Sequence, residues 1–222
     1  MGNSTQPTGN STIIPTNSRD YYSCAGPDVK DYPPKGEWLS FNALWGINSP
    51  TIVKNNKDSA YADFIKQGIQ DVSRASKVDA RLILSIIMQE SGGNAQVECT
   101  GYDYKRDCGI MQMRGAANFS SSEPEKSIRE MIEDSVYGVS EPGDLSWIKG
   151  TFWQGNPFAA AHLYNAGSVE ENLTVQVGEN LNSKWYANDI ASRLLGWNGS
   201  KQGCENSRKC PNHGFENRQC QG

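Results

Sequence analysis

The stretch LILSIIMQESG at residues 82–92 decides the fold. If it is helical, steps of three and four residues place Glu90 on the same stripe as Leu82, Ile83 and Ile86. The Glu90 carboxyl then shares the face that packs inward, where ionisation is costly and the pKa is expected to rise. A carboxylic acid that keeps its proton near neutral pH can protonate a poor leaving group. The other interpretation is that Glu90 only caps or neutralises a helix end.

The composition around this stretch limits the classes of protein to consider. The chain has 222 residues, of which 36% are hydrophobic, enough for one sizeable core. No apolar run approaches the ~20 residues that span a bilayer, so no membrane association is expected. The net charge of -4 argues against nucleic-acid binding, which normally needs a basic surface. We therefore expect a monomer with one domain and tails.

The cysteines indicate an oxidised, exported protein. Their number is even, none of their spacings is CxxC, and the chain has only two histidines, so neither a metal site nor any cofactor is expected. A secreted, extracellular glycoprotein also fits the five N-x-S/T sequons, which begin at Asn3, Asn10, Asn118, Asn172 and Asn198. No signal peptide is visible, which fits a mature form. Among the possible disulfides we expect Cys99 with Cys108, which would close the loop after the Glu90 helix.

The chain divides into three parts. Residues 1–20 are rich in Ser, Thr, Asn, Pro and Gly and are expected to be a flexible leader or linker. Residues 21–200 hold the main domain, in which residues 21–50 are rich in aromatic residues and helix breakers and should wrap the domain without long regular elements. Residues 201–222 carry three of the six cysteines and are expected to be a disulfide-pinned tail packed on the domain.

Helix signals follow in series after residue 57. Asp58 or Ser59, then Asp79 and Asn156, are residues that favour a helix start, and the segment 122–125 has the form of a capping box. A last helix is indicated by an apolar residue at every fourth position, at Tyr186, Ile190 and Leu194. The chain shows no alternation of apolar and polar residues that would predict an extensive sheet. The predicted fold class is mainly α.

Two more motifs accompany the Glu90 helix. The first is GIMQM at residues 109–113, where glycine permits close backbone approach and Gln112 offers a donor and an acceptor. The second is AAAHLYNAG at residues 159–167, where Tyr164 and Asn165 present polar tips at a helix end. Each also has a purely structural interpretation, because methionines commonly fill cores and an Asn-Ala-Gly end is ordinary capping.

The three motifs in this order resemble the lysozyme-like family that includes goose-type lysozymes and soluble lytic transglycosylases, glycoside hydrolase family 23. That family has a helix ending in Glu-Ser, then Gly-Leu-Met-Gln, then Tyr-Asn-Ala-Gly; the matching residues here are 90–91, 109–112 and 164–167. The resemblance covers roughly Val78 to Ser168. It implies a lysozyme-like helical domain with a glycan-binding groove, to which the disulfide-pinned N- and C-terminal extensions are added.

By matching position, the resemblance implies roles for individual residues. Glu90 would be the catalytic acid, and Asp103 would hold the attacking water as a second catalytic residue. Substrate contacts would come from Ser91, Gln112, Met113, Tyr164 and Asn165.

The chain departs from the family at one catalytic position. A second water-holding acid would fall near Arg114, where this chain has no carboxylate. Asp107 and Glu98 lie in the same loop and could replace it, although surface solvation is the simpler role for both. The departure puts the water-activating part of the site in doubt.

The resemblance implies a secreted muramidase that cleaves the β-1,4 bond between N-acetylmuramic acid and N-acetylglucosamine in peptidoglycan. If Asp103 holds a water, the product is hydrolysed and inverted. If no residue activates water, the substrate's own 6-hydroxyl closes onto the anomeric carbon, as in lytic transglycosylases. The negative net charge suggests action at acidic pH or on uncharged chitin. A non-catalytic glycan-binding protein is the alternative from another class.

Overall fold

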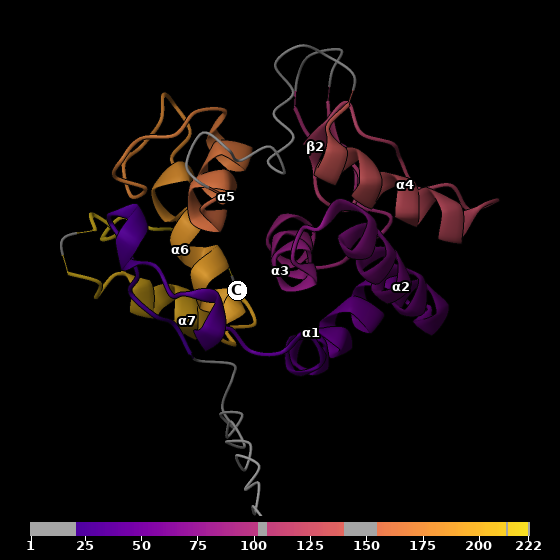
Figure 1. The fold of residues 1–222 in the computed structure, drawn as a ribbon, viewed down its shortest axis with the longest axis horizontal. Helices are drawn as coiled ribbons and strands as arrows, with labels where there is room; N and C mark the ends of the chain where they lie inside the picture. The colour runs from indigo at the N-terminus through magenta and orange to yellow at the C-terminus, as the bar shows by residue number, and fades with distance from the viewer. Residues whose placement is uncertain (1–20, 102–105, 140–154, 212, 222) are drawn as a thin grey trace, which may run out of the picture.

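The computed structural model describes residues 21–101, 106–139, 155–211 and 213–221, and it is mainly helical (Figure 1). The mainly α prediction is confirmed. The α-helices are α1 (Phe41–Asn56), α2 (Ser59–Ser76), α3 (Ala80–Glu90), α4 (Pro124–Tyr137), α5 (Pro157–Ala166), α6 (Ser183–Leu194) and α7 (Lys201–Ser207). Two short 3-10 helices, Val29–Asp31 and Lys35–Glu37, precede them. The strands β1 (Asp107–Cys108) and β2 (Met113–Arg114) form one antiparallel pair.

Helix α3 lies at the centre of the molecule, between α1, α2 and α4 on one side and α5 and α6 on the other (Figure 1). Asp79 caps it as predicted, since its side chain accepts a hydrogen bond from the backbone N–H of Arg81. Every residue from 82 to 88 is buried, so the helix is enclosed on all sides instead of presenting a single stripe. Only its last turn, which ends at Glu90, opens to a cavity.

Helix α1 corrects the expectation that residues 21–50 hold no long regular element. It is 16 residues long and contains Pro50. The Ser40 side chain caps its start by accepting a hydrogen bond from the backbone N–H of Ala43. Proline in a helix removes one hydrogen bond and crowds the carbonyl four residues earlier. Here that earlier residue is Gly46, and the helix continues through both residues. The prediction was wrong because it rested on the local density of aromatic residues and helix breakers, whereas α1 is stabilised by packing against α2 and α3.

The predicted capping box at residues 122–125 is also wrong, although the helix it announces exists. Helix α4 begins at Pro124, and Glu123 at the cap position makes no side-chain capping bond. Ser127 instead accepts a hydrogen bond from the backbone N–H of Ser120. The apolar residues Ile128, Met131, Ile132 and Val136 of α4 are buried, and Gly68 of α2 lets Ile132 approach closely.

Helices α5 and α6 follow the sequence signals closely. Asn156 caps α5 by accepting from the backbone N–H groups of Phe158 and Ala159, and Pro157 opens the helix. Gly167 ends it with φ +72°, a left-handed backbone that glycine adopts without strain. Residues 158–162 are buried, and α5 packs along α6.

One of the three disulfides ties the tail to the rest of the chain, since Cys24 pairs with Cys210. Cys204 pairs with Cys220 and closes a loop within the tail. Cys99 pairs with Cys108, as predicted. The tail also contains helix α7, and the proposed boundaries at residues 20 and 200 stay predictions. None of the helices in the described ranges combines the length and apolar content needed to cross a bilayer.

Candidate active site

A cavity of about 560 Å³ opens at the carboxyl end of α3. Glu90 lines it together with residues from β1, β2, the segment between the strands and the end of α5. Four of the five substrate contacts named from the sequence line this cavity beside the acid: Gln112, Met113, Tyr164 and Asn165. The three motifs therefore meet in one place, although up to 75 residues separate them in the chain.

The Glu90 carboxyl sits where ionisation is disfavoured. Burial raises its pKa, and the negative charge of Asp107 raises it further, whereas a hydrogen bond from the Tyr186 hydroxyl and the charge of Arg193 lower it. The resulting pKa is about 7, against 4.5 for an ordinary glutamate. The side chain keeps partial access to the cavity. Glu90 is therefore a carboxylic acid that holds its proton near neutral pH, as the sequence predicts.

A second carboxylate, that of Asp107, lines the same cavity. It lies in β1 directly opposite Arg114 of β2, the position at which the sequence lacks the expected acid. Of the other two acids named from the sequence, Glu98 lines a different cavity with Arg106, and Asp103 lies outside the described residues.

Ser91 does not line the cavity but bonds to the backbone next to it. Its hydroxyl bonds to the carbonyl oxygens of Ile110 (2.7 Å) and Ile87 (3.2 Å), and it accepts from the backbone N–H of Gly93. These bonds join the end of α3 to the segment 109–113. Ser91 thereby fixes Glu90 relative to Gln112.

The backbone of the segment 109–113 is unusual at two positions. Gly109 has φ +72°, and a side chain there would come within 2.8 Å of the Ala117 carbonyl oxygen. Gln112 has φ +48°, a conformation that residues other than glycine rarely adopt. Its amide donates to the Gly109 carbonyl (3.0 Å) and accepts from the Thr100 hydroxyl (3.0 Å). Gln112 is held rigidly at the cavity wall.

Helix α5 is bonded to the same segment through Tyr164. The Tyr164 hydroxyl donates to the Met111 carbonyl oxygen at 2.6 Å, and burial raises its pKa well above the usual value. At the next position, the Asn165 side-chain oxygen accepts from the Asn180 amide at 3.1 Å. Both side chains are therefore fixed at the edge of the cavity.

A second cavity, of about 410 Å³, lies on the other side of the acid and shares Glu90 and Asn165 with the first. Helix α6 and the C-terminal tail form much of its wall, with Trp185 and Asn217 among the lining residues. Glu90 therefore lines both cavities.

A buried polar network fixes this side of the site, with Asp189 of α6 at its centre. The Asp189 carboxylate accepts two hydrogen bonds from Arg218 of the tail (2.7 and 2.5 Å), one from the Tyr22 hydroxyl (2.7 Å) and one from the Gln89 amide (2.9 Å). Gln89 in turn accepts from Arg193 Nε at 2.7 Å. The network joins the N-terminal segment, the tail, α6 and the end of α3 next to Glu90.

Arg193 has fewer hydrogen bonds than its buried guanidinium could make. It is buried, and within the described residues its Nη1 has no hydrogen-bond partner. Burial lowers its pKa to about 10. Its guanidinium lies over the Trp197 ring, 5.0 Å from the centroid, and its positive charge favours the ionised form of Glu90.

Sequence reasoning missed most of the groups on this side. Tyr186 was assigned only to an apolar stripe, and Gln89, Asp189, Arg193 and Arg218 were not considered. One signal was available: α6 places Asn188, Asp189, Ser192 and Arg193 among apolar residues, too many polar groups for an ordinary buried helix. Among the described residues, no cluster of three or more His, Cys, Asp or Glu is arranged to hold a metal ion.

Comparison with known proteins finds no family model, no curated protein and no solved structure that matches this chain.

Proposed function

We propose that this chain is a secreted glycoside hydrolase, a muramidase that cleaves the β-1,4 bond between N-acetylmuramic acid and N-acetylglucosamine in peptidoglycan. One observation carries the proposal: Glu90, with its pKa raised to about 7, lines two cavities that could hold neighbouring units of a polymer. The resemblance of the three motifs to lysozyme-like enzymes supplies the substrate class. The three disulfides support an extracellular location.

In the first step, Glu90 donates its proton to the oxygen of the glycosidic bond as that bond breaks. Positive charge develops on the sugar, and the departing chain leaves as an alcohol. Glu90 becomes a carboxylate, which the Tyr186 hydroxyl and the nearby charge of Arg193 stabilise. A proton donor with a pKa of about 7 is suited to this step near neutral pH.

In the second step, a water adds to the anomeric carbon and loses a proton to a base. We propose Asp107 as that base, because it lines the same cavity as Glu90. An inverting enzyme needs its two carboxyl groups ~6.5–9.5 Å apart to leave room for the water. Asp103 remains the candidate implied by the resemblance.

The position of Arg114 favours one other outcome of the same first step. Asp107 is the strand partner of Arg114, and a carboxylate that pairs with a cation is a weaker base. If Arg114 pairs with Asp107 in this way, no water is activated. The 6-hydroxyl of the substrate then closes onto the anomeric carbon and gives its proton to the Glu90 carboxylate, and no water is consumed. The chain would then be a lytic transglycosylase.

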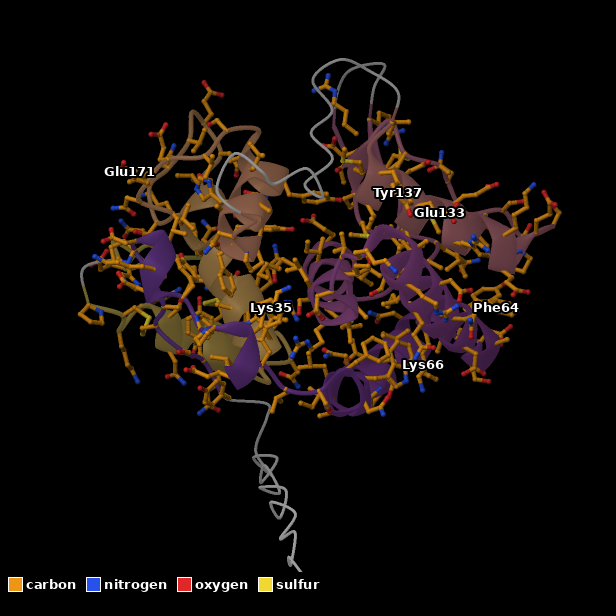
Figure 2. The ribbon with its side chains drawn as sticks, in the orientation of Figure 1. Lys35, Phe64, Lys66, Glu133, Tyr137 and Glu171 are labelled. Carbon is orange, nitrogen blue, oxygen red and sulfur yellow. A yellow bond between two sulfur atoms is a disulfide. The ribbon has the colours of Figure 1, made fainter. Side chains whose placement is uncertain are left out.

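Digestion of purified peptidoglycan, with mass spectrometry of the products, tests the proposal. We expect hydrolysed ends; anhydro ends, lighter by one water, would assign the transglycosylase reaction. Glu90→Gln keeps the shape and still accepts from Tyr186 but cannot donate the proton, so activity should fall at least ~10²-fold. Glu171→Gln is the matched control, since Glu171 is exposed on the loop after α5 (Figure 2). Full activity of Glu90→Gln would refute the proposal.

Asp107→Asn separates the two reactions. If Asp107 activates the water, this variant should lose hydrolysis while Glu90 still protonates the leaving group. A switch toward anhydro products is then expected. Unchanged hydrolysis would return the role to Asp103.

A further inference from the structure

The second cavity has a wall that the three motifs do not account for. Besides Glu90 and Asn165, it is lined by α6 and by the C-terminal tail, which lies outside the resemblance. Asn217, Gln219 and Gln221 of the tail line it, and all three are exposed. The tail therefore adds recognition surface directly beside the acid.

The chemistry of this wall suits a neutral sugar ring. The side-chain amides of Asn182, Asn217 and Gln219 each offer a donor and an acceptor, the combination that hydroxyl and acetamido groups need. Trp185 lines the cavity and is only partly buried, so it offers an apolar surface. A few polar groups around an aromatic side chain are typical of small-molecule sites.

The charged groups that line the cavity are largely committed to one another. Arg218 is ion-paired with Asp189, and both are buried. The pKa of Glu90 is about 7, so its carboxyl is mostly uncharged below that pH. Arg193 is the remaining cation, and its Nε already bonds to Gln89. The exposed part of the wall is therefore uncharged and is made of side-chain amides, Trp185 and Leu181.

The tail wall is held in place before any ligand arrives. The guanidinium of Arg218 lies over three aromatic rings, 5.6 Å from Tyr22, 5.6 Å from Trp185 and 5.8 Å from Trp197. The disulfide from Cys204 to Cys220 closes the tail on both sides of Arg218. A wall that is already ordered loses little conformational entropy on binding.

We propose that the second cavity is a saccharide subsite, built in part by the C-terminal tail, that takes an N-acetylated sugar ring on one side of the bond presented to Glu90. The subsite rests on the proposed function, because it assumes that a glycan passes the acid. The ring packs on Trp185, and the amides of Asn182, Asn217 and Gln219 bond to its substituents.

Binding of the N-acetylglucosamine hexamer tests the subsite without turnover. The affinity is measured by calorimetry in the full-length Glu90→Gln variant, which cannot cleave the probe by the proposed mechanism. Trp185→Ala in this background should weaken binding by about tenfold, the effect of losing one well-packed aromatic contact. Tyr137→Ala is the matched control, because Tyr137 is an exposed aromatic residue on α4 and lines neither cavity among the described residues (Figure 2).

A second variant keeps the test decisive if Trp185→Ala does not fold. Asn217→Ala removes an exposed amide and should weaken hexamer binding by about threefold. Hexamer affinity that is unchanged in Asn217→Ala and in every folded Trp185 variant would overturn the subsite. Failure of the proposed function has a different signature, since Glu90→Gln would then clear bacterial walls as well as the native chain does.

Discussion

The two sides of α3 differ in the kinds of side chain that are buried there. On the side of α2 and α4, apolar side chains such as Ile69 and Ile132 fill the interface, and charged residues such as Glu133 stay at the surface (Figure 2). On the side of α6 and the tail, a carboxylate and two guanidinium groups are buried together. The apolar side packs against the body of α3, whereas the polar side bonds to Gln89, next to Glu90.

The two sides of α3 contribute differently to stability and to the geometry of the site. Burial of apolar surface stabilises a fold without demanding exact directions. A buried ion pair is a poor source of net stability, because desolvation offsets most of the attraction, but it fixes the groups around it. We infer that the polar network of α6 and the tail is retained to hold Gln89 and Glu90. Its ion pair should therefore affect activity as well as stability.

The largest expected effect follows from breaking the buried pair. Arg218→Met leaves the Asp189 carboxylate buried without its cation, which should cost about 3–5 kcal/mol of unfolding free energy. The double variant Arg218→Met with Asp189→Leu should regain much of that stability but not the activity, since Gln89 then loses the Asp189 carboxylate that accepts its hydrogen bond. Denaturant unfolding and wall-clearing assays measure both. Recovery of full activity in the double variant would show that the polar network is not needed to hold Gln89 and Glu90.

The matching change on the apolar side is Ile132→Ala. Ile132 is fully buried in α4 and contacts α2 close to Gly68, so the cavity left behind should cost about 2–5 kcal/mol. Activity per folded molecule, assayed well below the unfolding temperature, should stay unchanged. A loss of activity as large as that of Arg218→Met would show that the two sides do not divide their roles.

The same division explains which features the sequence predicts. Caps such as Asp79 and Asn156 lie within a few residues of the groups they bond, so local patterns reveal them. The Asp189 network joins residues as far apart as Tyr22 and Asp189, 167 positions along the chain. No periodicity encodes such a contact. Helix α1 was missed for a related reason, because its stability comes from packing on α2 and α3.

The predicted site follows the same rule. Glu90, Gln112 and Tyr164 were found because short motifs carry them. Asp107 was considered only as a substitute, since its place in the cavity depends on the β1–β2 pairing and on the Cys99–Cys108 disulfide. Tyr186 was assigned to an apolar stripe because of its four-residue spacing from Ile190, and only the fold brings its hydroxyl to Glu90.

The next effect is a dependence of stability on pH that Glu90 causes. The pKa of Glu90 is about 7 in the folded chain and near 4.5 when unfolded, so the folded state holds the proton more tightly. Below pH 4.5 both states are protonated and Glu90 carries no penalty; as the pH rises through 7, about 3 kcal/mol of stability is lost. Glu90→Gln should therefore match the native chain at pH 4 and exceed its stability by that amount at pH 8. Equal stability at both pH values would contradict the raised pKa.

The smallest expected effect belongs to the surface of the apolar side. Arg129 and Glu133 form an exposed pair four residues apart on α4, at 2.8 Å. Exposed pairs of this kind contribute little to stability, because water screens them and both side chains lose freedom. Glu133→Gln should therefore leave the denaturation midpoint almost unchanged and leave activity untouched. A cost comparable to that of Arg218→Met would mean that ion pairs stabilise both sides of α3 equally, and the buried pair would then need no role at the acid.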